Sequence, residues 1–95
     1  MLSPNAMPSR AERTAFRMVG GEALVMVIDR RELHRLNQVG ARVFELCDGA
    51  TPLLGIVAAV VREFAIDIDT ARADVERFVT ELGQAGALCL EAEGR

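Results

Sequence analysis

The sequence contains no tryptophan, no tyrosine and no lysine. Four phenylalanines supply all of the aromatic bulk, so a core has to be built mainly from leucine, valine, isoleucine and alanine. Apart from one histidine, every basic residue is an arginine, and the formal net charge is −3 over 95 residues. Proteins that bind duplex DNA usually carry a basic surplus, because their affinity comes largely from cations that displace phosphate counterions. The composition therefore argues against nucleic acid as a partner.

Cysteine and histidine are scarce. Cys47 and Cys89 belong to no closely spaced pair, and His34 is the only histidine. Zinc motifs usually contain ligand pairs two to four residues apart, so we predict no metal site and no cofactor. Both cysteines lie among apolar residues, which is typical of small buried hydrophobic side chains. No constellation of nucleophile, acid or base stands out, and we predict no catalytic residue.

Long apolar runs are also missing. The longest, residues 23–28, is far shorter than the roughly 20 residues that span a bilayer. The first residues lack the apolar segment of a secretory signal. Because isolated cysteines suit a reducing compartment, we expect a cytoplasmic protein with reduced thiols and no membrane partner.

The sequence does contain an extended pattern in its first half. Residues 14–19 alternate in polarity and are separated by Gly20-Gly21 from the apolar run 22–29, which predicts a hairpin. The second strand is apolar at nearly every position, so it is either covered on both faces or covered on one and closely paired. A third strand over 32–36 is short and half polar, as edge strands often are.

Three helical patterns follow. Asn37 can cap the first helix, and Asp48 with Gly49 can end it. The second helix is expected over 52–64, and the third begins after Asp69 or Thr70 and ends at Gly86. A last short strand over 87–90 is a further possibility. Strands followed by helices, without alternation, predict an α+β domain with a three-stranded antiparallel sheet. We expect a flexible N-terminal arm over 1–12, a domain over 13–90 and a tail over 91–95.

Four segments follow one another at a definite spacing: Arg35-Leu36-Asn37, Leu46-Cys47-Asp48-Gly49, the segment 52–64, and the segment 73–82 followed by Gly86. In this order they resemble the motifs of the PqqD-like family. The family comprises the small chaperone of pyrroloquinoline quinone biosynthesis and its relatives, the recognition elements for ribosomally made, modified peptides. The resemblance covers residues 13–90. It implies a winged-helix-like fold in which the leader segment of a precursor peptide is added as a strand to the third strand, beside the third helix. A radical-SAM or other modifying enzyme would then act on the peptide.

An exposed strand edge with unpaired main-chain groups is what such peptide capture requires. The predicted peptide-binding residues are Glu32, Leu33, His34, Arg35, Leu36, Arg72, Val75, Glu76, Phe78, Val79 and Leu82. In this hypothesis Leu33 and Leu36 line a groove with the apolar helix residues, and Arg72 and Glu76 form its rim. The motif residues Asn37, Leu46, Cys47, Asp48 and Gly49 are predicted to be scaffold.

Alternatives stay open at this point. The apolar stripe of the third helix can simply be core, since a stripe at helical spacing is usually buried in its own domain. Three helices and a small sheet also describe a winged-helix DNA-binding regulator. A redox protein or enzyme that uses Cys47 is a third reading. The open edge is compatible with either a monomer or a strand-swapped dimer.

Overall fold

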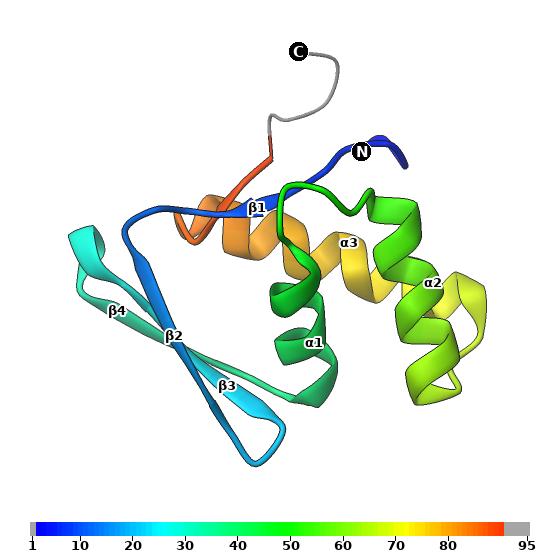
Figure 1. Ribbon diagram of the computed structural model, residues 1–95, viewed down its shortest axis with the longest axis horizontal. Coiled ribbons are helices and arrows are strands. Elements are labelled where there is room, and N and C mark those ends of the chain that lie inside the picture. The colour runs from blue at the N-terminus through cyan, green and yellow to red at the C-terminus, as the bar shows by residue number, and fades with distance from the viewer. Residues whose placement is uncertain (1, 91–95) are drawn as a thin grey trace.

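The computed structural model describes residues 2–90 and has a three-stranded sheet packed on three helices (Figure 1). The elements are β1 (Ser9–Arg10), β2 (Thr14–Val19), β3 (Glu22–Val27), a 3₁₀ turn (Ile28–Arg30), β4 (Glu32–Leu36), α1 (Gln38–Leu46), α2 (Leu53–Phe64), α3 (Ile68–Gln84) and β5 (Leu88–Cys89). The predicted α+β class, with three antiparallel strands, then three helices and a last short strand, is confirmed.

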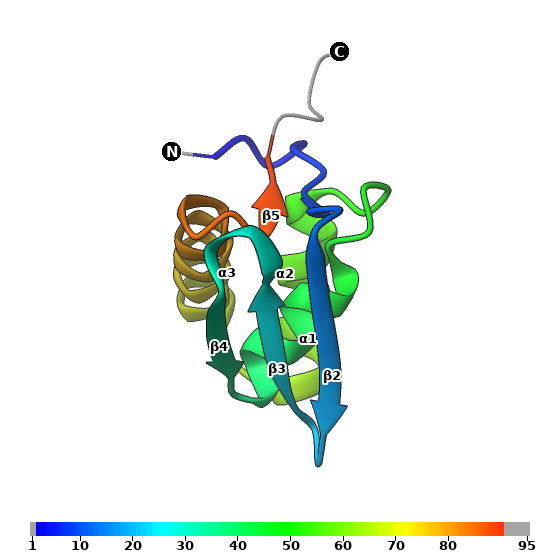
Figure 2. The same cartoon turned by 90° about the vertical axis from the view of Figure 1, so that its left-hand side faces the viewer.

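The sheet has the order β2-β3-β4, so both β2 and β4 are edge strands. Gly20 and Gly21 connect β2 to β3 with φ values of 60° and 85°, which suits the two-residue hairpin turn that the glycine pair predicts. Ala23, Val25 and Val27 are buried against the helices, whereas the other residues of β3 face away from them. Among the residues that the structure describes, β3 is therefore covered on one face only, and Figure 2 shows the sheet in front with the helices behind it.

The core lies between the inner face of the sheet and the three helices. Its largest fully buried apolar side chains are Phe44, Ile56, Val25, Val43, Val60, Val75 and Val79. Within residues 2–90, no polar or charged side chain is buried. The stability of the fold therefore depends on apolar packing and on the caps of the helices.

Two helix starts show how the caps are set. Asn37 caps α1 as expected, because its Oδ1 accepts a hydrogen bond from the Gly40 amide (2.9 Å). The cap of α3 is Asp67, not Asp69 or Thr70 as expected. The Thr70 hydroxyl (2.7 Å) and then its amide (3.2 Å) donate to the Asp67 carboxylate and lower the pKa of Asp67. Asp67, Asp69 and Thr70 are all residue types that can cap a helix. Asp67 is the cap because its carboxylate accepts from both the amide and the hydroxyl of Thr70.

The N-terminal segment, which we expected to be a flexible arm, is bound along the domain. Pro8 is fully buried, and β1 pairs with β5. The amides of Leu53 and Leu54, in the first turn of α2, donate to the carbonyl oxygens of Ala6 (2.7 Å) and Pro4 (3.0 Å). These donors have no partner within a helix, so main-chain carbonyls of the segment complete α2. Residues 91–95, expected to be a tail, lie outside the described residues.

A chain that begins at Met7 should be less stable than the full chain by about 2 kcal/mol, because two helix amides lose their acceptors. Its new positive amino group would also lie near the positive end of the α2 dipole. Urea denaturation of the two chains measures the difference. Asn5→Ala is the matched control, since it keeps the main chain and alters only an exposed side chain. An unchanged midpoint for the shortened chain would show that the segment does not support α2.

Candidate functional site

The free main-chain groups of the β4 edge follow from the register of the sheet. In an antiparallel pair, alternate residues exchange both hydrogen bonds with the neighbouring strand. The Ile28 amide donates to the Arg13 carbonyl oxygen (3.0 Å), which fixes the phase between β2 and β3. The even-numbered residues of β3 therefore bond to β2, and the odd-numbered residues bond to β4.

On β4, the residues opposite these odd-numbered partners are Glu32, His34 and Leu36. Their main-chain groups are used within the sheet. Leu33 and Arg35 consequently direct their N–H and C=O groups to the open edge. Two residues of the predicted site thus offer the hydrogen-bonding groups that an added strand needs.

The side chains of β4 divide between the two faces of the sheet. Glu32, His34 and Leu36 point toward the helices, and Leu36 is only 5% exposed. Leu33 and Arg35 point to the outer face, where Leu33 is 60% exposed. The prediction that Leu33 and Leu36 line one groove is therefore wrong, because strand residues three apart lie on opposite faces.

The predicted residues of α3 also separate into groups. Val75, Val79 and Leu82 are at most 4% exposed and belong to the core, as the alternative reading held. Phe78 is partly buried and lies against α1. It is the member of the set placed at the junction of α1 and α3, next to the end of β4.

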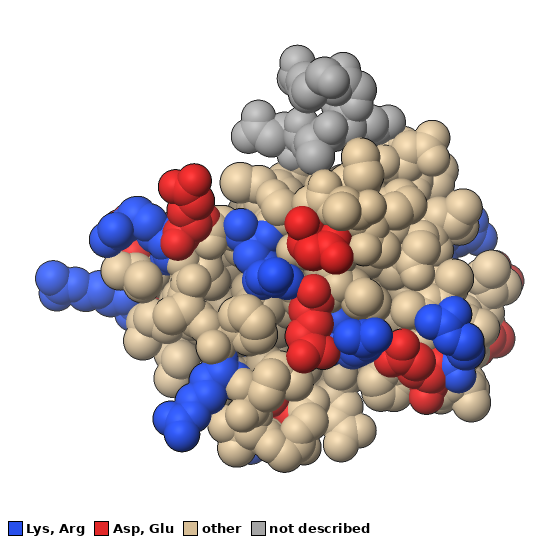
Figure 3. Space-filling view, viewed as in Figure 1, with Lys and Arg blue, Asp and Glu red and all other residues tan. Residues whose placement is uncertain are grey.

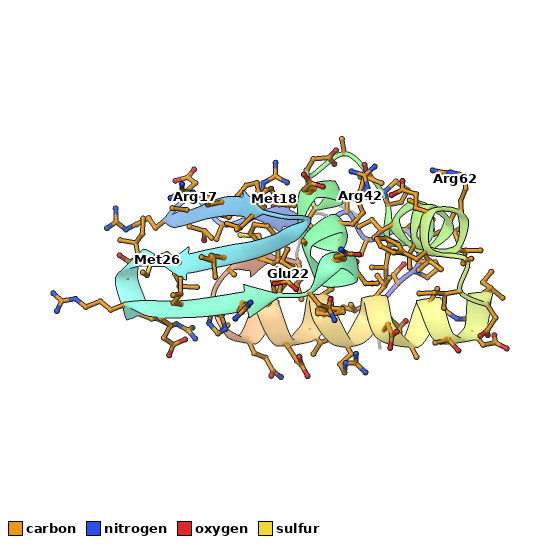
Figure 4. The ribbon with its side chains drawn as sticks, turned by 90° about the horizontal axis from the view of Figure 1, so that it is seen from below. Arg17, Met18, Glu22, Met26, Arg42 and Arg62 are labelled. Carbon is orange, nitrogen blue, oxygen red and sulfur yellow. The ribbon has the colours of Figure 1, made fainter. Side chains whose placement is uncertain are left out.

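Arg72 and Glu76 lie away from the β4 edge. They line a cavity of about 150 Å³ with residues of the N-terminal segment and α2, namely Leu2, Pro4, Leu53, Leu54 and Val57. Helical spacing places Asp74 and Glu81 on the flank of Phe78 instead. The C-terminal part of α3 runs beside β4 (Figure 4), and the Arg30 guanidinium donates to the Gln84 carbonyl oxygen (2.8 Å) across this boundary.

The motif that follows α1 holds the turn into α2. The Asp48 carboxylate accepts hydrogen bonds from the amides of Ala50 and Thr51 (both 2.9 Å), and these bonds lower the pKa of Asp48. Gly49 has a φ of +78°, which a glycine adopts without strain. Leu46 packs partly buried against the core. These residues support the turn and the core, and their assignment as scaffold stays a prediction.

Cys47 is fully buried, and burial raises the pKa of its thiol to about 12. The thiol is protonated at neutral pH, whereas nucleophilic cysteines act as thiolates. Within the described part of the chain, no group of three His, Cys, Asp or Glu residues is placed to hold a metal ion. His34 Nε2 lies 3.3 Å from a carboxylate oxygen of Glu32, an exposed contact on the inner face.

The surface charge is mixed. Figure 3, in the same view as Figure 1, shows basic and acidic side chains interspersed over the helices. On α3, Arg72 contacts Asp69 (3.3 Å) and Arg77 contacts Asp74 (3.4 Å), so the helix presents both signs. This pattern does not favour the DNA-binding reading, which needs a basic surface. Over residues 2–90, the helices are too short or too polar to cross a bilayer.

The contact between α1 and α3 can be tested at Gly40. A Cβ at this position would lie 2.6 Å from the Phe78 ring, so Gly40→Ala should destabilise the fold by about 1–2 kcal/mol although alanine favours helices. In a Phe78→Ala background the same change should stabilise by up to about 1 kcal/mol, because the clash is gone. Chemical denaturation of the wild type, the two single variants and the double variant gives the sign of the change in the free energy of unfolding in each background. Gly55→Ala in α2, where the nearest atom is 3.3 Å away, is the control. The same sign in both backgrounds would contradict the contact.

Comparisons with known proteins agree with this architecture. The profile of the family described as coenzyme PQQ synthesis protein D (PqqD) matches residues 22–88, which is well over half of the chain. A search of curated proteins gives no match. The fold is similar to that of TbiB1, whose structure was solved in complex with the TbiA(beta) leader peptide. The TM-score is 0.77 at 21% identity, over 92% of this chain and 96% of that one, so this likeness concerns the fold alone. The match over residues 22–88 establishes that the chain belongs to the PqqD family.

Proposed function

We propose that this protein is a non-catalytic recognition element that binds the leader segment of a ribosomally made precursor peptide as a strand added to β4. It then presents the peptide to a modifying enzyme, such as a radical-SAM protein. The observation that carries the proposal is the open edge of β4, where the main-chain groups of Leu33 and Arg35 face outward. Membership of the PqqD family and the leader peptide bound to TbiB1 support it.

The surroundings of β4 favour this edge over that of β2. α3 runs beside β4 and supplies a second surface (Figure 2). Phe78 lies on this helix against Gly40 at the start of α1, and helical spacing places Glu81 on the same flank as Phe78. An added strand would place alternate side chains between β4 and this flank, where Leu36 and His34 face the helices. Main-chain hydrogen bonds would supply affinity, and the flank would supply selectivity.

Hydrogen exchange tests the proposal directly. The probes are synthetic leader segments of short precursor peptides encoded beside this gene. Binding should slow exchange at the Leu33 and Arg35 amides, while the His34 amide is already protected in the free protein. Protection at Thr14, Phe16 and Met18 instead would move the site to β2. If no leader protects either edge, the proposed function fails.

The role in presentation has its own test. The neighbouring modifying enzyme should process its precursor faster when this protein is added in trans, and an excess of leader peptide lacking the core segment should remove the gain. If this protein binds the leader but does not increase the rate of processing, binding does not serve to present the peptide to the enzyme. The cytoplasmic location and the oligomeric state stay predictions.

A further inference from the structure

The outer face of the sheet carries two rows of side chains in register. One row consists of Ala15, Met26 and Leu33, and the other consists of Arg17, Leu24 and Arg35. No helix covers this face among the described residues (Figure 2). We call these the apolar row and the arginine row. Each row ends at β4, in one of the two residues whose main chain faces the open edge.

A strand added to β4 would extend both rows. Residues directly opposite each other on neighbouring strands share a face of the sheet. The peptide residues opposite Leu33 and Arg35 would therefore point to the outer face, and the residue between them would point to the helices. Each row gains one side chain from the peptide, so the ends of the rows can read its sequence.

The apolar row favours an apolar side chain on the added peptide strand. Leu33 is 60% exposed, the largest value among the large hydrophobic side chains of the described residues, and its neighbour Met26 is 37% exposed. An apolar side chain opposite Leu33 would remove surface of both partners from water. A charged or polar side chain would leave that surface exposed.

The arginine row favours an acid. The Arg35 side chain is 78% exposed, and its contact with Glu22 is long, at 3.3 Å. Arg17, at the other end of the row, has no ion pair within residues 2–90. The outer face thus holds two guanidinium groups and one carboxylate, although the whole chain is acidic. A carboxylate opposite Arg35 would balance the row.

We propose that Leu33 and Arg35 determine specificity by selecting leader segments with an apolar residue and an acidic residue two positions apart. The inference rests on the proposed addition of a strand to β4. The order of the two residues also reports the direction of the peptide. An acid that precedes the apolar residue indicates an antiparallel strand, because β4 runs from Leu33 to Arg35, and the reverse order indicates a parallel one.

The test selects binders from a displayed library of random 12-residue peptides on the wild type, Arg35→Glu, Leu33→Ser and Arg62→Glu. Arg62→Glu makes the same change in net charge on α2, far from β4 (Figure 4). Wild-type binders should combine Asp or Glu with an apolar residue two positions away. Arg35→Glu should select Lys or Arg at the acidic position, Leu33→Ser should lose the apolar preference, and Arg62→Glu should change neither.

Representative peptides are then synthesised, mapped by hydrogen exchange and titrated. Exchanging the acid for Lys should weaken binding to the wild type about fivefold and strengthen binding to Arg35→Glu by a similar factor. If peptides protect the Leu33 and Arg35 amides but the charge preference is the same on both proteins, this inference fails and strand addition stands. If no selected peptide protects these amides, strand addition fails with it. Protection of both amides in the free protein by a second copy would also overturn the assignment.

Discussion

Leu33→Pro should weaken peptide binding at least about tenfold while the domain stays folded. Proline has no N–H to donate, and it is tolerated where a strand's N–H faces away from the sheet. The register turns the Leu33 N–H to the open edge, and the side chain is 60% exposed, so the fold loses little. Fluorescence anisotropy with a labelled leader measures the affinity, and circular dichroism measures the fold.

His34→Pro is the matched control, one residue along the same strand. The His34 N–H bonds to β3, so proline there should break the ladder and reduce both stability and binding. Full binding by a folded Leu33→Pro protein would exclude strand addition at this edge. Equal destabilisation by the two prolines would contradict the phase of hydrogen bonding between β3 and β4.

Phe44→Ala should cost about 3–5 kcal/mol, a large part of the stability of a small domain. Phe44 is fully buried in α1, and its ring packs edge-on against Phe16 with centroids 5.0 Å apart. Because tryptophan and tyrosine are absent, no other buried side chain among residues 2–90 is as large. Its removal opens a cavity between the sheet and the helices.

Urea denaturation of Phe44→Ala and Leu54→Ala makes the comparison. Leu54 is 57% exposed on α2, so its truncation should change the free energy of unfolding by no more than about 0.5 kcal/mol. Similar losses for the two variants would mean that the packing around Phe44 does not hold the sheet on the helices. If only Phe44→Ala is destabilised, this variant should also lose peptide binding at temperatures where it unfolds and the Leu54→Ala protein stays folded.

The local parts of the fold were predictable because short patterns determine them. Period-two alternation, the Gly20-Gly21 pair and the Asn37 cap each depend on neighbours in sequence, and all three hold in the structure. The division of β4 between two faces follows from the same alternation. Strict use of that period separates Leu33 from Leu36 without any structure.

The remaining features depend on packing between distant segments. Arg72 and Glu81 are both polar residues beside the apolar stripe of α3, and only the placement of β4 decides which flank faces it. The N-terminal segment leaves even less trace, because its contacts to α2 use the carbonyl oxygens of Pro4 and Ala6. Every residue has the same main-chain carbonyl acceptor, so no pattern of side chains in the sequence predicts these contacts.

The pairing of β1 with β5 has a consequence for how this domain can be joined to others. It brings the two ends of the described chain together at one pole, opposite the Gly20-Gly21 hairpin (Figure 1). A fusion partner attached at either end would therefore extend from that pole and leave β4 uncovered. The same closeness permits a short linker between the ends, so that the chain could be reopened at the hairpin as a circular permutant with its peptide edge intact.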